Sequence, residues 1–119
     1  STTGSLPVGR GCLLTGALAP DGSFLVIPPT GADSLCSGVI FETDIDDANS
    51  GFMAQVGLTN VQLKIGATAV SKGDKLNIQD NTGVWQPAPS LSTNVYYLAL
   101  QNAAAGALCW AAPIASRPL

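Results

Sequence analysis

Few side chains in this sequence could do chemistry. There is no histidine, so the commonest general base and the commonest zinc ligand are both missing. Three cysteines, Cys12, Cys36 and Cys109, form no closely spaced pair, and an odd count without an export signal is typical of reduced thiols. Free cysteine is also among the most buried residue types. We therefore expect three buried thiols that act as small hydrophobic residues.

The densest group of carboxylates is the segment DIDDANSG, which holds Asp44, Asp46 and Asp47. A calcium-binding EF-hand loop needs an oxygen ligand at its fifth position, glycine at its sixth and glutamate at its twelfth. Counted from Asp44, those positions hold Ala48, Asn49 and Gln55. The pattern indicates a solvated acidic loop, and we expect no metal site.

No motif for catalysis or nucleotide binding is present. The sequence lacks the G-x-S-x-G of serine hydrolases, the P-loop and G-x-G-x-x-G, and the GRG at residues 9–11 has no phosphate-binding continuation. We therefore expect that the protein is not an enzyme, and that it has no catalytic residue, no cofactor-binding residue and no cofactor.

The composition points to a surface that other subunits cover. Hydrophobic residues make up 46% and charged residues only 11% of the chain, against about 25% charged residues in an average soluble protein. The mean hydropathy is +0.31. Because obligate interfaces are apolar and poor in charge, this composition predicts a homo-oligomer.

The sequence disfavours two classes of partner, nucleic acid and membrane. The net charge is −3 and there is no basic stretch, so we expect no nucleic acid partner. Residues 81–116 carry no charge, but glycine and proline interrupt them, and no apolar run reaches the ~20 residues of a membrane span. We expect no membrane partner.

The elements that hold these residues are predicted to be strands. VQLKI (61–65) and KLNIQ (75–79) alternate apolar and polar residues, which is typical of half-buried strands. SFLVI (23–27), GVIF (38–41) and NVYYLAL (94–100) are more uniformly apolar, as central strands can be. A helix over 99–112 is the alternative there, because that stretch is rich in helix formers.

The chain also repeats itself. Four pairs are 62 positions apart: Val8 and Val70, Arg10 and Lys72, Gly11 and Gly73, Leu14 and Leu76. Gly22 and Phe24 match Gly83 and Trp85 at a separation of 61 positions. VIFE (39–42) matches LALQ (98–101) at a separation of 59 positions, and SGFMAQV (50–56) matches AGALCWA (105–111) at a separation of 55 positions. We therefore predict pseudo-repeats at about 8–65 and 66–113.

Together these patterns predict an all-β fold, an antiparallel β-barrel or β-sandwich that forms a single domain over residues 8–113. Residues 1–7 and 114–119 lie outside the repeats, so we expect an N-terminal arm and a C-terminal tail, extended and ordered by contact with neighbouring chains. The charges around Gly73 and Gly11 are expected at exposed strand entrances, in solvated turns.

The order of these pieces resembles a known family. VSKGDKL (70–76), TGVWQPA (82–88) and YLALQNAAAGALCWAA (97–112), with SGVIFETDIDDANSG (37–51) in the first repeat, are similar to the small capsid cement, or decoration, proteins of tailed bacteriophages. The first repeat departs from the pattern at Cys12-Leu13 and at DIDDANSG.

The resemblance implies a structural protein without chemistry. Such proteins bind the outside of a phage head and bridge neighbouring major capsid proteins, often as trimers. It implies the major capsid protein as partner, a homo-oligomer for which a trimer is favoured and a dimer stays open, synthesis in the host cytoplasm and a place on the outer surface of the virion.

Two alternatives from other functional classes stay open. Lipoyl and biotinyl carrier domains also have a V-x-x-G-D-x-L strand, and the lysine to be modified would be Lys64, although it lies in an alternating strand and not at a hairpin tip. A surface adhesin would bind sugar through exposed aromatic rings. The candidates for that role are Trp85, Tyr96, Tyr97 and Trp110.

Overall fold

The structure, a computed structural model, describes residues 6–41, 52–57 and 59–114. These residues form strands joined by turns, and none of them is in a helix. The strands are β1 (Gly11–Leu18), β2 (Phe24–Ile27), β3 (Gly38–Phe41), β4 (Phe52–Gln55), β5 (Val61–Lys64), β6 (Lys75–Ile78), β7 (Trp85–Pro87), β8 (Tyr97–Ala99) and β9 (Leu108–Pro113). A search of the described residues for a helix long and apolar enough to cross a membrane finds none.

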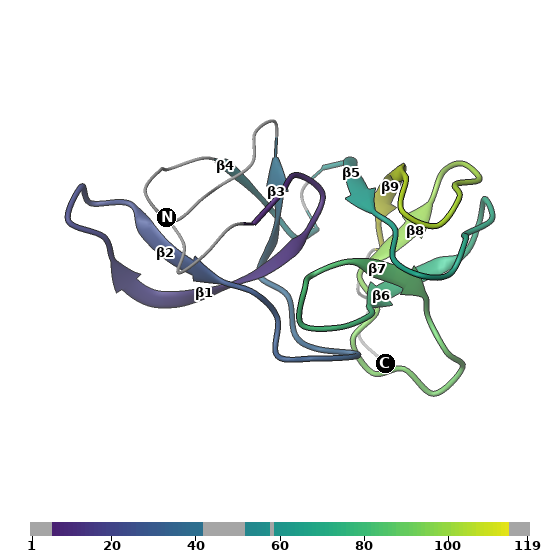
Figure 1. Cartoon of the computed structure of the whole chain (residues 1–119), viewed down its shortest axis with the longest axis horizontal. Helices are drawn as coiled ribbons and strands as arrows, with labels where there is room; N and C mark the ends of the chain where they lie inside the picture. Colours follow the sequence, from purple (N-terminus) through teal and green to yellow (C-terminus); the bar gives the residue numbers. More distant parts are fainter. Residues whose placement is uncertain (1–5, 42–51, 58, 115–119) are drawn as a thin grey trace.

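Two antiparallel sheets pack as a β-sandwich (Figure 1). The four-stranded sheet has the order β2-β1-β3-β4, and the five-stranded sheet has the order β5-β9-β8-β6-β7. The all-β prediction is confirmed, with a sandwich in place of a closed barrel. The helix alternative over 99–112 is wrong, because that segment contains the end of β8 and all of β9 except its last residue.

The strand order repeats between the two sheets. Read from its β7 edge, the second sheet has the order β7-β6-β8-β9, which matches β2-β1-β3-β4 strand for strand. The two halves therefore share one connectivity, as the sequence repeat predicts. The additional strand β5 pairs with β9 at the edge of the second sheet, although it falls in the first pseudo-repeat of the sequence.

At the start and at the end of the repeat, the residues that are equivalent in the structure differ from the pairs aligned in the sequence. The Gly9 N–H donates to the Ile40 carbonyl at 3.0 Å and the Gly73 N–H donates to the Ala99 carbonyl at 2.8 Å, so Gly9 and not Gly11 is the equivalent of Gly73. The 61-position match at Phe24 and Trp85 is confirmed, because these residues close equivalent hairpins opposite Leu18 and Ile78.

The last strand is also misaligned in the sequence repeat. Ala54 lies opposite Val39 in the first sheet, and Ala112 lies opposite Leu98 in the second, a separation of 58 positions and not 55. Turns of different lengths between the strands produce these shifts, because turns accept insertions that strands do not.

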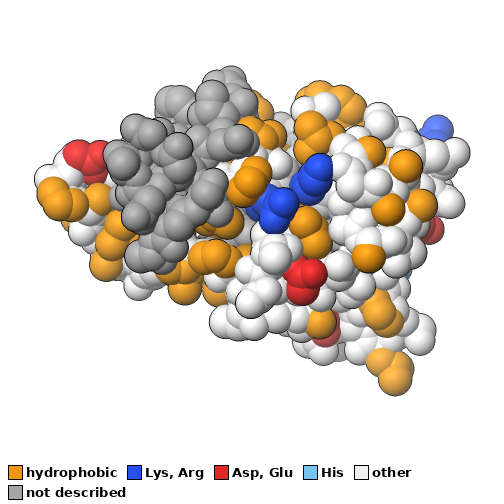
Figure 2. Space-filling view, viewed as in Figure 1, with side chains coloured by type: hydrophobic (Ala, Val, Ile, Leu, Met, Phe, Trp, Pro, Cys, Tyr) orange, Lys and Arg blue, Asp and Glu red, His pale blue; other side chains and the backbone are white. Residues whose placement is uncertain are grey.

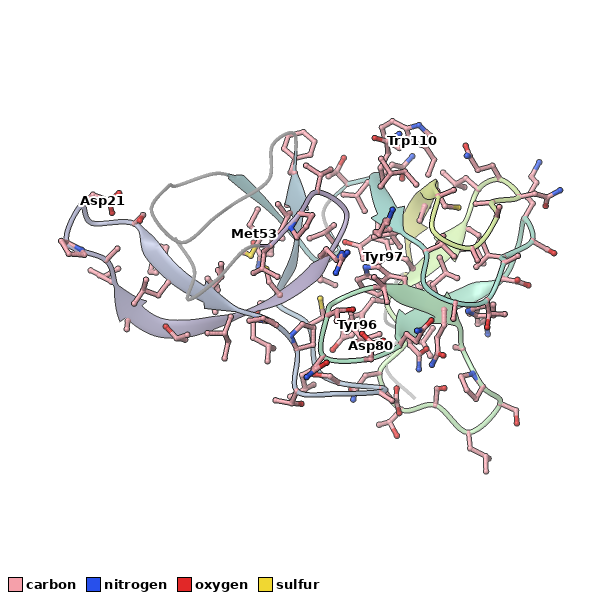
Figure 3. The ribbon with its side chains drawn as sticks, viewed as in Figure 1. Asp21, Met53, Asp80, Tyr96, Tyr97 and Trp110 are labelled. Carbon is pink, nitrogen blue, oxygen red and sulfur yellow. The ribbon has the colours of Figure 1, made fainter. Side chains whose placement is uncertain are left out.

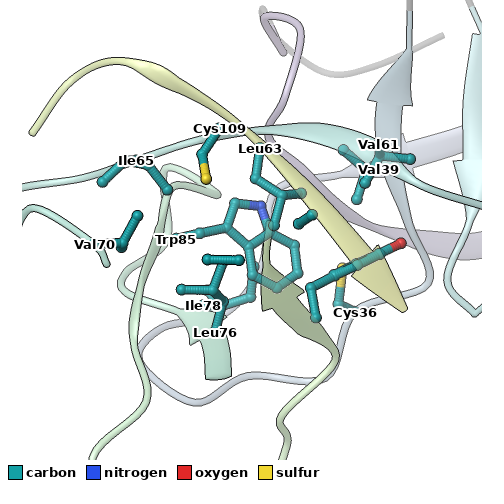
Figure 4. Close-up of a cluster of buried hydrophobic side chains, with 13 residues drawn as sticks. Cys36, Val39, Val61, Leu63, Ile65, Val70, Leu76, Ile78, Trp85 and Cys109 are labelled. Carbon is teal, nitrogen blue, oxygen red and sulfur yellow. The ribbon is translucent and has the colours of Figure 1, made fainter. Parts of the chain in front are cut away.

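The molecule has two hydrophobic clusters. The larger lies around Trp85 and takes residues from β5 to β9 as well as Cys36 and Val39 of the first half (Figure 4). The smaller contains Leu6, Cys12, Val26 and Ile40. Leu6 was predicted to belong to an extended arm, and this is wrong, because its side chain is buried in the core. Residues 1–5 and 115–119 of the predicted arm and tail lie outside the described residues.

Candidate interaction surface

The seam between the two halves is built on the turn at Gly9. Gly9 has a φ of +86°, and a Cβ atom there would lie 2.7 Å from the backbone nitrogen of Lys64. Its carbonyl accepts hydrogen bonds from the Lys64 N–H at 3.0 Å and from the Trp85 indole at 3.1 Å. Only glycine fits a left-handed turn that approaches another backbone this closely.

Arg10 belongs to the same seam. Its Nη1 donates to the Thr82 carbonyl at 3.0 Å, and the side chain is half-buried. The prediction that Arg10 lies at an exposed strand entrance is therefore wrong. The neighbouring Gly11 N–H donates to the Gly83 carbonyl at 2.8 Å, which adds a second link between the halves.

The equivalent turn of the second repeat faces solvent, as predicted. Gly73 has a φ of +94°, and a Cβ atom there would have no atom within 4 Å. Lys72 and Lys75 are exposed, and the Asp74 carboxylate accepts the Ser71 N–H at 2.8 Å. These charges stabilise and solvate a turn and form no binding cluster.

The three cysteines are free and buried, which confirms the expectation from the sequence. Burial raises the pKa of Cys12 to about 12 and that of Cys36 to about 11. Burial also raises the pKa of Cys109. Because the thiolate is the reactive form, none of the three is a nucleophile near neutral pH.

The described residues hold no group of three or more His, Cys, Asp or Glu side chains that could bind a metal. The acidic segment with Asp44, Asp46 and Asp47 lies outside the described residues, so the expectation of a solvated loop stays a prediction. Lys64 lies in β5, where its Nζ donates to the Gly106 carbonyl. A lysine held in a strand this way does not have the hairpin-tip position of a carrier-domain lysine.

Most of the aromatic residues considered for sugar binding are structural. Trp85 and Tyr97 are fully buried and meet edge to face, with ring centroids 5.4 Å apart. The Tyr96 hydroxyl accepts the Cys36 N–H at 3.1 Å, and its ring packs edge to face on Trp85. Trp110 alone of the four is exposed, at 46%, and it lies at the edge of the molecule in Figure 3, apart from Tyr96 and Tyr97.

Trp110 lines a pocket of about 250 Å³ between the halves. The other lining residues are Val8, Ile40, Phe41, Val61 and Gln62. Gln62 lies directly opposite Trp110 across β5 and β9, and the Phe41 side chain is 43% exposed. The pocket, called here the Trp110 groove, therefore offers two aromatic rings and one amide to a partner. Sequence analysis found Trp110 but missed Phe41, because an apolar strand gives no signal for which of its members is exposed.

A second apolar surface lies on the β1–β2 hairpin. Leu14, Leu18 and Phe24 are 44%, 59% and 63% exposed, and we call these three side chains the hairpin face. Figure 2 shows hydrophobic side chains along the visible part of the end formed by this hairpin, and acidic atoms at its tip. Nothing in the sequence pattern distinguished these residues from core positions.

A third feature is a clamp between two loops. The Asp33 carboxylate accepts the N–H groups of Thr93 and Asn94 at 2.8 and 2.9 Å, and the Asn94 side chain donates to the Asp33 carbonyl at 2.8 Å. These hydrogen bonds lower the pKa of Asp33. The clamped loops carry Leu35 and Leu91, whose side chains are both strongly exposed. The clamp was not predicted, because its partners are 60 or more residues apart in sequence.

The fold has a counterpart among solved structures. The chain is similar to the crystal structure of the head fiber gp8.5 N base of bacteriophage phi29, with a TM-score of 0.59 and 21% sequence identity. The match covers 96% of this chain and 88% of that chain. At this identity the likeness establishes a shared fold. Neither a known protein family nor a curated protein matches the sequence.

Proposed function

We propose that the protein is a structural component of a bacteriophage head, which binds the outer surface of the capsid and bridges neighbouring major capsid proteins. It would act as a cement or decoration protein, as a homo-oligomer for which a trimer is favoured over a dimer. Its place would be on the virion, after synthesis in the host cytoplasm. It would do no chemistry.

The observation that carries the proposal is the shared fold with a phage head fiber base, over 96% of this chain. The pieces of sequence that resemble cement proteins contain β3, β7 and β8 and parts of β6 and β9 of that same fold. The resemblance of the sequence to cement proteins and the likeness of the fold to a head fiber base both support a structural protein of a phage head. Fold alone does not determine function, so the surface must support the role as well.

The surface does support it. The exposed residues include several large apolar side chains: Leu14, Leu18, Phe24, Leu35, Phe41, Leu91, Leu100, Leu108 and Trp110. Exposed apolar patches mark interaction surfaces. Tryptophan is enriched among the residues that dominate binding energy, so the Trp110 groove is the best candidate for the capsid contact.

Bridging would stabilise a head by mass action. A protein that binds the assembled shell and not its separated subunits makes separation less favourable by RT ln(1 + [L]/Kd) at each site. Each contact can be modest, because many equivalent sites on the shell act together. Apolar contacts such as those of Trp110 would be little weakened by salt, unlike contacts between exposed charges.

Co-sedimentation with heads tests the proposal. Purified protein is mixed with heads of the phage that encodes it, and the pelleted fraction is measured at increasing protein concentration. We expect saturable binding that survives molar salt and that Trp110→Ser weakens at least tenfold, while Lys72→Ser, in the exposed turn, leaves it unchanged. An absence of binding at any concentration would refute the capsid role.

The Trp110 groove favours one second candidate, a carbohydrate-binding adhesin. An exposed tryptophan opposite a glutamine side chain can stack on a sugar ring and hydrogen-bond its hydroxyls. Of the aromatic residues considered for this role, Trp110 is the one at the groove. A glycan array with the wild-type protein and Trp110→Ser distinguishes the two candidates, since a cement protein gives no signal that depends on Trp110.

A further inference from the structure

The two repeats differ most at their first hairpin. β1 has 8 residues and its equivalent β6 has 4, and the register of β1 shifts between Leu14 and Leu18. In the second repeat the closing pair Ile78 and Trp85 is fully buried. The equivalent pair in the first repeat, Leu18 and Phe24, is more than half exposed. One hairpin therefore builds the core, and the other carries apolar side chains of the same kind into solvent.

The hairpin face continues the smaller core cluster. Residues directly opposite each other on antiparallel strands share a face of the sheet, as do residues two apart on one strand. Phe24 and Val26 are two apart on β2, Leu18 lies opposite Phe24, and Leu14 lies opposite Val26. Val26 is buried against Cys12 and Ile40, so the apolar surface that starts in this cluster runs outward along the hairpin.

We propose that a second copy of this chain covers the hairpin face, so that copies of the protein self-associate through their β1–β2 hairpins. The inference concerns the protein in solution and does not rest on the capsid role proposed above. The contact between copies would explain why the first hairpin of the chain is longer and more exposed than its equivalent in the second repeat.

Charge decides between the possible occupants. Asp21, at the hairpin tip, is the one charged residue between positions 11 and 27. A charged partner surface would lose its hydration on this face and find no opposite charge in return. The occupant must therefore be apolar and uncharged, and the same face of another copy meets that condition.

Net charge favours the same surface for self-association. Each chain carries a net charge of −3, so two copies repel each other at most orientations. Among the described residues, the β1–β2 hairpin carries no charge except Asp21 at its tip, so contact through the hairpin face brings few like charges together. Self-association through the exposed turn around Lys72 and Asp74 would instead desolvate charged groups.

Light scattering coupled to gel filtration tests the proposal. The wild type should have a mass that is a multiple of the 12.0 kDa chain, and the double variant Leu14→Ser/Leu18→Ser should have the mass of one chain. Leu91→Ser is the matched control, because Leu91 is 94% exposed and belongs to the β7–β8 loop, which lies at the other end of the molecule from the hairpin (Figure 1), and it should keep the wild-type mass. Because all three leucines are exposed, the variants should keep the wild-type circular dichroism spectrum.

Chemical cross-linking gives a second readout that does not depend on removing the contact. The native cysteines are buried, so a flexible bis-maleimide should react selectively with a cysteine introduced on the surface. Leu18→Cys should give a covalent dimer in minutes at micromolar concentration, and Leu91→Cys should stay monomeric under the same conditions.

The outcomes separate this inference from the capsid role. A wild type that is monomeric at its highest soluble concentration, or equal masses for the double variant and the wild type, would overturn the inference. If the wild type is monomeric and the double variant loses binding to heads, the hairpin face contacts the capsid, and the inference falls while the proposed function stands. If the hairpin variant alone dissociates and no form binds heads, the inference stands and the capsid role falls.

Discussion

Trp85 and Trp110 occupy opposite environments, although both lie on short strands of the same sheet. Trp85 sits at the centre of the larger cluster, and its indole donates to the Gly9 carbonyl across the seam. Trp110 lines the groove and is half exposed. The first holds the halves together, and the second is available to a partner.

This difference predicts opposite effects of substitution. Trp85→Ala removes a fully buried side chain, leaves a cavity and removes one of the two hydrogen bonds to the Gly9 carbonyl, so it should lower the free energy of unfolding by about 3–5 kcal/mol. Trp110→Ala should change the free energy of unfolding by less than about 1 kcal/mol, as expected of exposed positions. Urea unfolding of both variants measures this. Equal losses for the two would contradict their assignment to core and surface.

The buried thiols should be unreactive in the folded protein. The pKa values of about 12 for Cys12 and about 11 for Cys36 leave almost no thiolate at pH 8. A colorimetric thiol reagent at pH 8 should therefore release almost no chromophore from native protein, and three equivalents per chain in guanidinium chloride. Rapid release of one equivalent from the native protein would show that a thiol is accessible.

Asp33 should make stability depend on pH in the acid range. Hydrogen bonds from Thr93 and Asn94 hold its folded pKa below the ordinary value of 3.8. The carboxylate therefore stabilises the fold above pH 3.8, and this contribution is lost as the pH falls through the lower folded pKa. Asp33→Asn removes the charge and tolerates the positive φ of this position, so the variant should be less stable than wild type at pH 7.

The measurement is the urea midpoint of wild type and Asp33→Asn between pH 2 and pH 7. The gap between the two proteins should be largest near neutral pH and should narrow toward pH 2. A gap that stays constant over the whole range would show that the clamp does not depend on the charge of Asp33.

At the scale of elements, the two glycine turns make a matched pair. Gly73→Ala places a Cβ in open space but in a left-handed conformation, so it should cost about 1–2 kcal/mol of the free energy of unfolding. Gly9→Ala adds a clash with the backbone of Lys64 and should cost clearly more. Thermal unfolding compares them. A smaller loss for Gly9→Ala would mean that the seam at Gly9 adjusts easily.

Strand positions could be predicted because alternation and apolar runs depend on local burial. VQLKI (61–65) and KLNIQ (75–79) contain β5 and β6 almost residue for residue. The register of the repeat could not be predicted, because VGRG contains two glycines. Only the backbone hydrogen bonds and the positive φ angles of the folded chain show that Gly9 is the equivalent of Gly73. The transfer of β5 to the second sheet depends on pairing with β9, which comes more than 40 residues later.

The candidate surface was harder to predict than the fold. The sequence identified Trp110 among four aromatic residues. Of the other three, Trp85 and Tyr97 belong to the core and Tyr96 packs against it. Residue type alone does not separate Leu14 and Leu18, which face solvent, from Leu63 and Leu76, which are buried. Whether a leucine is buried depends on which strands pack over it, and this is decided only when the two sheets come together.

At the scale of the whole molecule, the two halves have the same strand connectivity but differ in what they bury and what they expose. The second half holds the larger core, and the first half carries the exposed hairpin face. The Trp110 groove lies between them. The two contacts proposed above, with a second copy through the hairpin face and with the capsid through the Trp110 groove, lie on separate surfaces, which is the arrangement that a bridging protein needs.

The central claim, that this protein stabilises a phage head from outside, is tested most directly by heating heads and recording DNA release. Heads stripped of the protein are compared with native heads and with stripped heads to which the purified protein has been added back. The account predicts that stripped heads release their DNA at a lower temperature, that wild-type protein restores the native threshold, and that Trp110→Ser does not. Release of DNA at one temperature from all of these particles would contradict the account.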